Sequence, residues 1–237
     1  MRLLGHIIAV SVLFWQFDVM TLPWYSIIIA FIFCIGWLNV FNFMDGINGI
    51  TAFYSVITLF SMLYLNQTIK FTSKELIILL ILAVLVFSIF NVRKQAKTFS
   101  GDVGSISMAF LLAAFMILLM MQTGQIEYIL FFAVYGIDSV FTIIFRLIKK
   151  ENIFTAHRSH LYQYLCNELN QSHIFISSIY AIIQLGINIL TIYLIQKNQM
   201  TISLFFLILI ILSLSYLLIR FRVKQKIKLT NQKEKVK

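Results

Sequence analysis

Long apolar runs, separated by short polar segments, make up most of the chain. A membrane-spanning helix needs about 20 mostly apolar residues, and eight runs reach or approach that length. They lie at 4–20, 24–41, 50–65, 76–90, 103–121, 128–145, 174–196 and 202–220. The runs are uniformly apolar and lack the two-residue alternation of barrel strands, so they predict helices. We therefore expect an all-α fold, a polytopic transmembrane helical bundle of about eight helices.

The amino-acid composition also indicates a membrane protein. Hydrophobic residues occupy 60% of the 237 positions, charged residues occupy 12%, and there is a single proline. A soluble core of this size cannot bury so much apolar surface, so lipid must cover the remainder. The first run follows a basic residue as a signal peptide would, but His6 interrupts it and no small-residue cleavage site follows near Asp18. We interpret it as a membrane helix.

The formal net charge of +10 is unevenly distributed along the chain. If the N-terminus is cytoplasmic, 16 of the 19 lysine and arginine residues fall in segments on that side, and only Lys70, Lys74 and Lys197 fall on the other. Cytoplasmic loops typically carry such an excess. We therefore expect both termini in the cytoplasm, with a transmembrane domain at 1–220 and a basic cytoplasmic tail at 221–237. The tail is expected to be attracted to anionic lipid, at about 1 kcal/mol per basic residue near the surface, and nucleic acid is not an expected partner.

A first polar cluster lies between the second and third runs, at 39–49. Asn39, Asn42 and Asp45 recur every third residue and would share one face of a helix. Gly46 and Gly49 let the backbone turn and approach a ligand closely. A polar helix end with an Asx turn is the alternative, but a stripe of this kind at a membrane boundary favours a functional site.

A second cluster, at 100–105, opens the fifth run with the sequence Ser-Gly-Asp-Val-Gly-Ser. A helix N-terminus offers free N–H groups and a positive dipole end, which suit a phosphate. Asp102 would stabilise that helix by roughly 1 kcal/mol if it only capped it. The glycines on both sides instead leave room around a carboxylate, and Mg²⁺ takes one or two carboxylates together with phosphate oxygens and water. We predict that Asp102 is such a ligand.

A third cluster lies at 157–163, in the basic segment between the sixth and seventh runs. His157 and His160 are three residues apart, which would allow zinc, but no further ligand falls at the usual spacing. Arg158 between them favours binding of an anion, since arginine can hold a phosphate through two hydrogen bonds. A solvated basic loop is the alternative.

One carboxylate lies inside an apolar run. Asp138 is a functional candidate by default, because ionisable groups are costly in a membrane. Arg146 follows about two helical turns later and could face the same pocket. Simple pairing or helix packing is the alternative.

These motifs, in this order, resemble the MraY/WecA-type family of polyprenyl-phosphate N-acetylhexosamine-1-phosphate transferases. The resemblance runs over about residues 2–164 and rests on Asn-x-x-Asn-x-x-Asp-Gly-x-Asn-Gly, Gly-Asp-Val-Gly-Ser and His-Arg-x-His. It implies transfer of a sugar-1-phosphate from a UDP-sugar such as UDP-N-acetylglucosamine to undecaprenyl phosphate, with release of UMP. The His-Arg-Ser-His form is more similar to the branch that starts O-antigen, capsule or teichoic-acid chains than to the peptidoglycan pentapeptide branch.

The resemblance also implies a location and roles for single residues. It implies a multi-pass protein of the bacterial inner membrane with cytoplasmic active-site loops, Mg²⁺ as cofactor with Mn²⁺ as a substitute, and membrane lipid as a partner. A homodimer is left open. The metal candidates are Asn42 and Asp102, and the catalytic candidates are Asp102, Asp45, His157, Arg158 and His160. The substrate-binding candidates are Asn39, Asn48, Asn91 and Asp138.

The chain departs from the family pattern at its start. Family members typically carry further N-terminal helices and an Asp-Asp pair, and residues 1–4 resemble the stretch just after that pair. No two acidic residues are adjacent in this sequence. An N-terminally shortened, inactive membrane protein of the same family is therefore one alternative to the enzyme. A transporter is another, because of Asp138 and the polar helix ends, but it would require inverted repeats that the sequence does not show.

Overall fold

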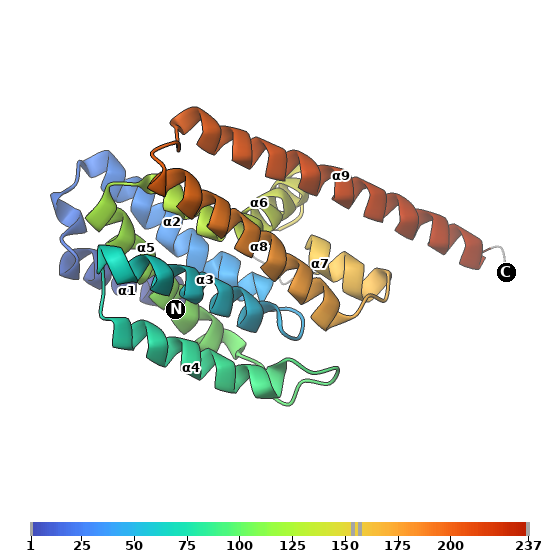
Figure 1. Ribbon diagram of the computed structural model, residues 1–237. Coiled ribbons are helices and arrows are strands. Elements are labelled where there is room, and N and C mark those ends of the chain that lie inside the picture. Colours follow the sequence, from blue (N-terminus) through green and yellow to red (C-terminus); the bar gives the residue numbers. More distant parts are fainter. Residues whose placement is uncertain (1, 153–154, 156–157, 236–237) are drawn as a thin grey trace.

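The chain forms a bundle of helices in a computed structural model that describes residues 2–152, 155 and 158–235. No strand occurs among these residues, which confirms the all-α prediction. The α-helices are α1 (Arg2–Gln16), α2 (Trp24–Met44), α3 (Ile50–Ile69), α4 (Lys74–Asn91), α5 (Gly101–Thr123), α6 (Ala133–Ile148), α7 (Leu161–Gln163), α8 (His173–Gln196) and α9 (Ile202–Lys235) (Figure 1). The 3₁₀ segments η1 (Val19–Thr21) and η2 (Ile126–Phe132) precede α2 and α6, and a π-helical turn, η3 (Tyr164–Glu168), follows α7.

Within the described part of the chain, six helical segments are long and apolar enough to cross a membrane, so this is a multi-pass membrane protein. They are Trp24–Met44, Lys74–Asn91, Gly101–Thr123, Ile126–Ile148, His173–Gln196 and Ile202–Thr230.

Two of the eight predicted spans differ from this set. The first apolar run forms α1, which is 15 residues long and therefore short for a span. The third forms α3, which has 20 residues but carries a line of buried polar side chains. These side chains are Thr51, Ser55, Thr58, Ser61 and Asn66. The helix α3 packs against α4, α5 and α8, and Asn188 of α8 donates to Ser61 Oγ at 2.9 Å.

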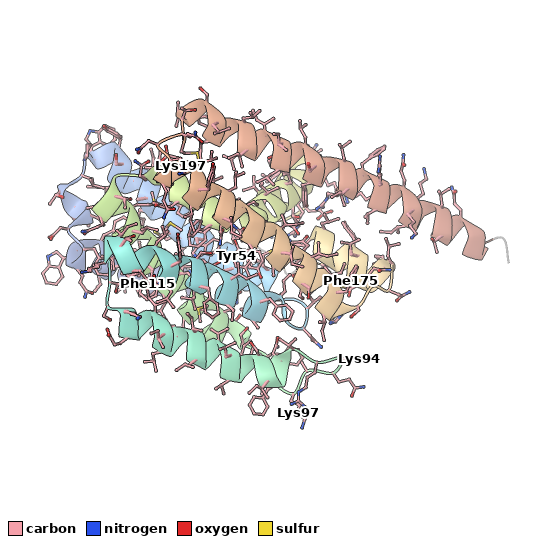
Figure 2. The ribbon with its side chains drawn as sticks, in the orientation of Figure 1. Tyr54, Lys94, Lys97, Phe115, Phe175 and Lys197 are labelled. Atoms are coloured by element: carbon pink, nitrogen blue, oxygen red, sulfur yellow. The ribbon has the colours of Figure 1, made fainter. Side chains whose placement is uncertain are left out.

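Stacked aromatic rings fix the helices in the centre of the bundle. Trp37 stacks on Phe132, and Tyr54 stacks on Tyr135, each with ring centroids 3.7 Å apart. The polar ends of these rings donate to backbone carbonyls of other helices, for example Tyr135 Oη to the carbonyl of Ile50 at 3.0 Å. Figure 2 shows Tyr54 within the bundle. The core therefore joins α2, α3 and α6, which carry site residues at their ends.

Successive long helices run in opposite directions, so the connecting segments collect at the two ends of the bundle (Figure 1). The segments 45–49, 92–100 and 158–172 lie at one end, which we call the motif end. The α3–α4 and α8–α9 connections lie at the other end, and Figure 2 shows Lys197 there, opposite Lys94 and Lys97. That the motif end faces the cytoplasm, as the charge distribution predicts, stays a prediction.

The helix α9 continues without a break past Arg220 to Lys235. The basic segment predicted as a tail is therefore helical as far as it is described, and it projects beyond the other helices at the motif end (Figure 1).

Candidate functional site

Hydrogen bonds join all three polar clusters at the motif end. Asn42 of the first cluster bonds to Asp102 of the second, and the Ser100 hydroxyl donates to the Asp45 carboxylate. Tyr162 of the third cluster donates from Oη to the carbonyl of Phe43 at 3.0 Å. Segments more than 50 residues apart in the sequence therefore form one polar site.

Asn42 and Asp102 form the centre of this site. Asn42 lies in the last turn of α2, and its Nδ2 donates to Asp102 Oδ1 at 3.1 Å and to Ser105 Oγ at 2.7 Å. Asp102 lies in the first turn of α5 and is exposed, whereas Ser105 is buried. Because the Asp102 carboxylate is exposed, a cation can reach it from solvent. The N-terminus of α5 beside it attracts anions.

The backbone at the start of α5 requires glycine at one position. Gly101 has φ +59°, in the left-handed region, where another residue would cost roughly 1–2 kcal/mol. The glycine before Asp102 is therefore explained by chain conformation as well as by room for a ligand.

Asp45 bridges the first and second clusters. Its Oδ1 accepts a hydrogen bond from Thr51 Oγ1 at 2.6 Å, and its Oδ2 accepts one from the Ser100 hydroxyl. The first hydroxyl comes from α3 and the second from the N-cap of α5. The carboxylate is half-buried, so these bonds set its orientation beside the Asn42–Asp102 pair.

Asn48 and Asn91 are buried and hold the loops in place. Asn48 Nδ2 donates to the carbonyl of Arg93 at 2.8 Å, and Asn91 Oδ1 accepts from the N–H of Gly49 at 2.7 Å. Gly49 has φ +86°, which favours glycine. Both amides therefore position the loops of the site, and contact with a nucleotide stays a prediction for them.

Asn39 bonds within its own helix. Its Nδ2 donates to the carbonyl of Ile35, one turn back, at 2.8 Å. The predicted polar stripe thus divides: Asn42 and Asp45 bond to the second cluster, and Asn39 bonds along α2.

The third cluster is only partly described. His157 lies outside the described residues. Arg158 is exposed. His160 is buried at the N-cap of α7, and its backbone N–H donates to Gln163 Oε1 at 3.2 Å.

Asp138 holds this cluster from inside the bundle. Its Oδ1 accepts from the N–H of Leu161 at 3.1 Å and lies 3.3 Å from His160 Nδ1. Tyr180 of α8 and Tyr216 of α9 donate to the same carboxylate, at 2.7 and 3.0 Å. Asp138 is fully buried, and its contacts support a role in positioning His160. Contact of Asp138 with substrate stays a prediction.

Arg146, a candidate for the same pocket as Asp138, bonds to the segment after α6. Its Nε lies 3.1 Å from the Glu151 carboxylate, and it also donates to the carbonyls of Asn152 and Thr155. These bonds order the start of the 149–160 segment.

Tyr162 packs directly against the first cluster. A Cβ atom at Gly46 would overlap with Tyr162 Oη and would lie 3.1 Å from Gln163 Nε2. Burial, followed by the nearby Asp138 and Asp45 carboxylates, raises the pKa of the Tyr162 phenol well above its usual value. Tyr162 therefore stays protonated and remains a donor to Phe43. The glycine in the Asp45-Gly46 pair is needed because another segment approaches it.

The donor set fits Mg²⁺ bound together with a phosphate. The described residues contain no group of three histidine, cysteine, aspartate or glutamate side chains able to hold a metal ion. Asp102 and Asn42 supply one carboxylate and one amide, and Mg²⁺ usually completes its shell with substrate phosphate oxygens and water. Substrate and water would therefore supply the remaining ligands of a metal ion bound to Asp102 and Asn42.

Several residues of the network had no predicted role. Ser105 lies three residues after Asp102, a helical spacing that would have placed it on the same face. Arg220, whose Nη2 donates to the carbonyl of Ser159 at 2.8 Å, is a charge at the end of an apolar run, which is a usable signal. Tyr180 and Tyr216 carry no such signal, because tyrosine is common in membrane helices.

The comparisons with known proteins agree with these motifs. The model of glycosyl transferase family 4 matches residues 2–120, which include the first two clusters and end before the third. A phospho-N-acetylmuramoyl-pentapeptide-transferase of Streptococcus agalactiae is 34% identical over 138 residues, 57% of this chain and 35% of the relative. The enzymes of the same name from Streptococcus pneumoniae and Streptococcus thermophilus are 34% and 35% identical over 98 and 103 residues.

The chain matches only about a third of the length of these relatives. The family match itself covers half of the chain and contains Asn42, Asp45 and Asp102. The resemblance to MraY/WecA-type transferases is therefore confirmed, and the chain belongs to glycosyl transferase family 4.

Proposed function

We propose that this protein transfers a sugar-1-phosphate from a UDP-sugar to undecaprenyl phosphate and releases UMP. The proposal rests on one observation. The Asn42–Asp102 pair, Asp45 and the N-terminus of α5 lie together at one end of the transmembrane helices. These groups suit a diphosphate and its metal ion, and family membership supports a transferase.

The reaction moves one phosphoryl group. An oxygen of the acceptor phosphate attacks the phosphorus that bears the sugar, a new P–O bond forms, and the P–O bond to UMP breaks. The products are a lipid-linked sugar diphosphate and UMP. Catalysis of such a transfer depends mainly on positioning and on neutralising charge.

Each part of the site has a role in this proposal. Asp102 and Asn42 would hold Mg²⁺, which neutralises charge on the phosphates when bound. The N–H groups at the start of α5 bind a phosphate oxygen. Asp45, whose carboxylate is oriented by hydrogen bonds from Thr51 and Ser100, would lie near the nucleotide of the donor.

The third cluster supplies positive charge in this proposal. Arg158 is exposed and can bind the diphosphate through two hydrogen bonds. His160 is held in place by Asp138 and orients the segment that carries Arg158. His157 would contribute a further donor to the diphosphate or sugar.

Two donor classes compete for this site. The His-Arg-Ser-His motif favours a simple UDP-N-acetylhexosamine and a product that starts a surface glycan. The relatives named above favour UDP-N-acetylmuramoyl-pentapeptide, over the part of the chain that matches them. A panel that contains both donors distinguishes these products.

The test is UMP release by the protein in proteoliposomes with undecaprenyl phosphate and Mg²⁺. We expect release with one donor class, a loss of about a hundredfold to a thousandfold in Asp102→Asn, and loss on chelation that Mg²⁺ or Mn²⁺ restores. Ser107→Ala, an exposed position two residues after Ser105 on α5, is the matched control and should retain activity.

Two outcomes would contradict the transferase. Binding of UDP-sugar that depends on Asp102, without UMP release from any donor, would support the inactive relative. Uptake of a solute into the proteoliposomes without UMP release would support the transporter.

A further inference from the structure

The helix α9 changes from apolar to basic while it continues as one helix. Leu214, Leu218 and Phe221 are exposed on its outer surface, as expected for contact with lipid chains. Lysines at 224, 226 and 228 follow within two turns. This part of α9 therefore passes through the level of the lipid headgroups.

A pocket of about 520 Å³ lies here, between α9 and the segments that follow α6 and α7. Its lining includes three lysines, Lys149, Lys224 and Lys228, together with Tyr164 and the single carboxylate Glu168. The pocket is separate from the Asn42–Asp102 pair, since none of its lining residues belongs to the first or second cluster.

Packing holds positive charges close together beside this pocket. Lys224 Nζ lies 5.2 Å from the centre of the Phe145 ring, and the Arg220 guanidinium lies 4.8 Å from the same centre. Both cations also lie over the Tyr164 ring, at 5.8 and 5.4 Å. The rings attract each cation, while the two like charges repel each other.

Few negative charges offset this group. Lys149 lies 3.6 Å from the Glu151 carboxylate, which Arg146 shares. Glu168 is the one acidic residue in the lining. An anion in the pocket would therefore relieve repulsion that the described residues leave in place.

We propose that this pocket binds the phosphodiester headgroup of an anionic phospholipid, with its acyl chains along the exposed apolar face of α9. The lysines match the charge of the phosphodiester, and their long side chains reach it from a helix in the membrane. Continuity with Leu218 and Phe221 favours a lipid over a soluble phosphate, which would gain nothing from that surface. The proposal does not depend on the transferase function.

The test compares two double variants of equal charge. Lys224→Gln with Lys228→Gln removes two lysines from the pocket. Arg222→Gln with Lys226→Gln removes two exposed cations that lie about 200° around the helix from the first pair. Retained lipid is counted by native mass spectrometry of the full chain, in detergent supplied with equal amounts of phosphatidylglycerol and phosphatidylcholine.

We expect the unmodified chain to retain phosphatidylglycerol in preference to phosphatidylcholine. Each pocket lysine should contribute about fivefold to the affinity for phosphatidylglycerol, so this affinity should fall about 25-fold in the pocket variant. In the control variant only the general surface charge changes, and the affinity should fall by less than about threefold. Elution volume and unfolding midpoint of both variants establish that they are folded.

Three results would overturn the proposal. Equal losses in the two double variants would mean a diffuse attraction to the basic helix. Equal retention of both lipids would mean that charge does not select the ligand. Displacement of phosphatidylglycerol by millimolar inorganic phosphate would mean that the pocket recognises phosphate without the lipid.

Discussion

The contact between Gly46 and Tyr162 allows a quantitative test of how the clusters fit together. In Gly46→Ala the new methyl group overlaps with Tyr162 Oη, so either the ring or the 45–49 loop must move. Overpacking of this kind costs about 1–3 kcal/mol. If the ring moves, the Tyr162 hydrogen bond to Phe43 is lost as well, at about 1 kcal/mol. The expected destabilisation is therefore about 2–4 kcal/mol.

The double variant with Tyr162→Phe separates these effects. Removal of the hydroxyl leaves the ring carbon Cζ at 3.1 Å from the added Cβ, a tight contact that a small shift relieves. Tyr162→Phe alone should cost about 1 kcal/mol. When Tyr162→Phe is already present, the alanine should cost less than about 1 kcal/mol, which gives a coupling free energy of at least about 1 kcal/mol between the two sites.

The assay is reversible unfolding in mixed micelles of increasing sodium dodecyl sulfate. Gly36→Ala is the matched control, because it lies in the interior of α2, the helix that precedes Gly46, and a Cβ there meets nothing within 4 Å. It should be neutral or stabilise by up to about 1 kcal/mol. Additive effects of Gly46→Ala and Tyr162→Phe would refute the close approach of the third cluster to the first.

Three further predictions concern the loops and the buried groups. Asn91→Ala removes the acceptor of the Gly49 N–H, so tryptic cleavage in the 92–100 loop should become at least about tenfold faster, while Asn39→Ala should leave it unchanged. Asp138→Asn should lower the free energy of unfolding by about 2–4 kcal/mol, measured as above, because four donors from outside its own helix share that carboxylate. Burial raises the pKa of Cys166 to about 11. Because maleimide reacts with the thiolate, the labelling rate of Cys166 in a Cys34→Ala chain should rise about tenfold per pH unit between pH 7 and 9. A labelling rate that levels off below pH 9 would contradict this.

The hydrophobic pattern predicted most of the fold because lipid leaves few alternatives. Uniform apolar runs had to be helices, and six of the eight are long and apolar enough to span a membrane. The two exceptions follow from length and from polarity. The helix that forms from the first apolar run ends at Gln16, and α3, which packs against α4, α5 and α8, includes buried polar residues.

Spacing within a segment predicted which polar residues would lie near one another, but it could not predict their partners. Asn42 and Asp45 bond to the second cluster as a shared helical face would allow, whereas Asn39 of the same stripe bonds to its own helix. The side chains of Asn48 and Asn91 form hydrogen bonds that hold two loops together. Those contacts depend on where α4 ends relative to α3, which no single segment encodes.

The side chains that hold the third cluster in place lie in a part of the chain outside the family match. The match ends at residue 120, yet His160 and Ser159 are held by Asp138 on α6 and by Arg220 on α9. Tyr180 on α8 and Tyr216 on α9 complete this support. Because hydrogen bonds from three helices converge on one carboxylate, a shift of α9 would move the segment that carries Arg158 relative to Asp102. The carboxylate and amide that suit Mg²⁺ thus lie in the matched half, and the position of the basic donors depends on the other half.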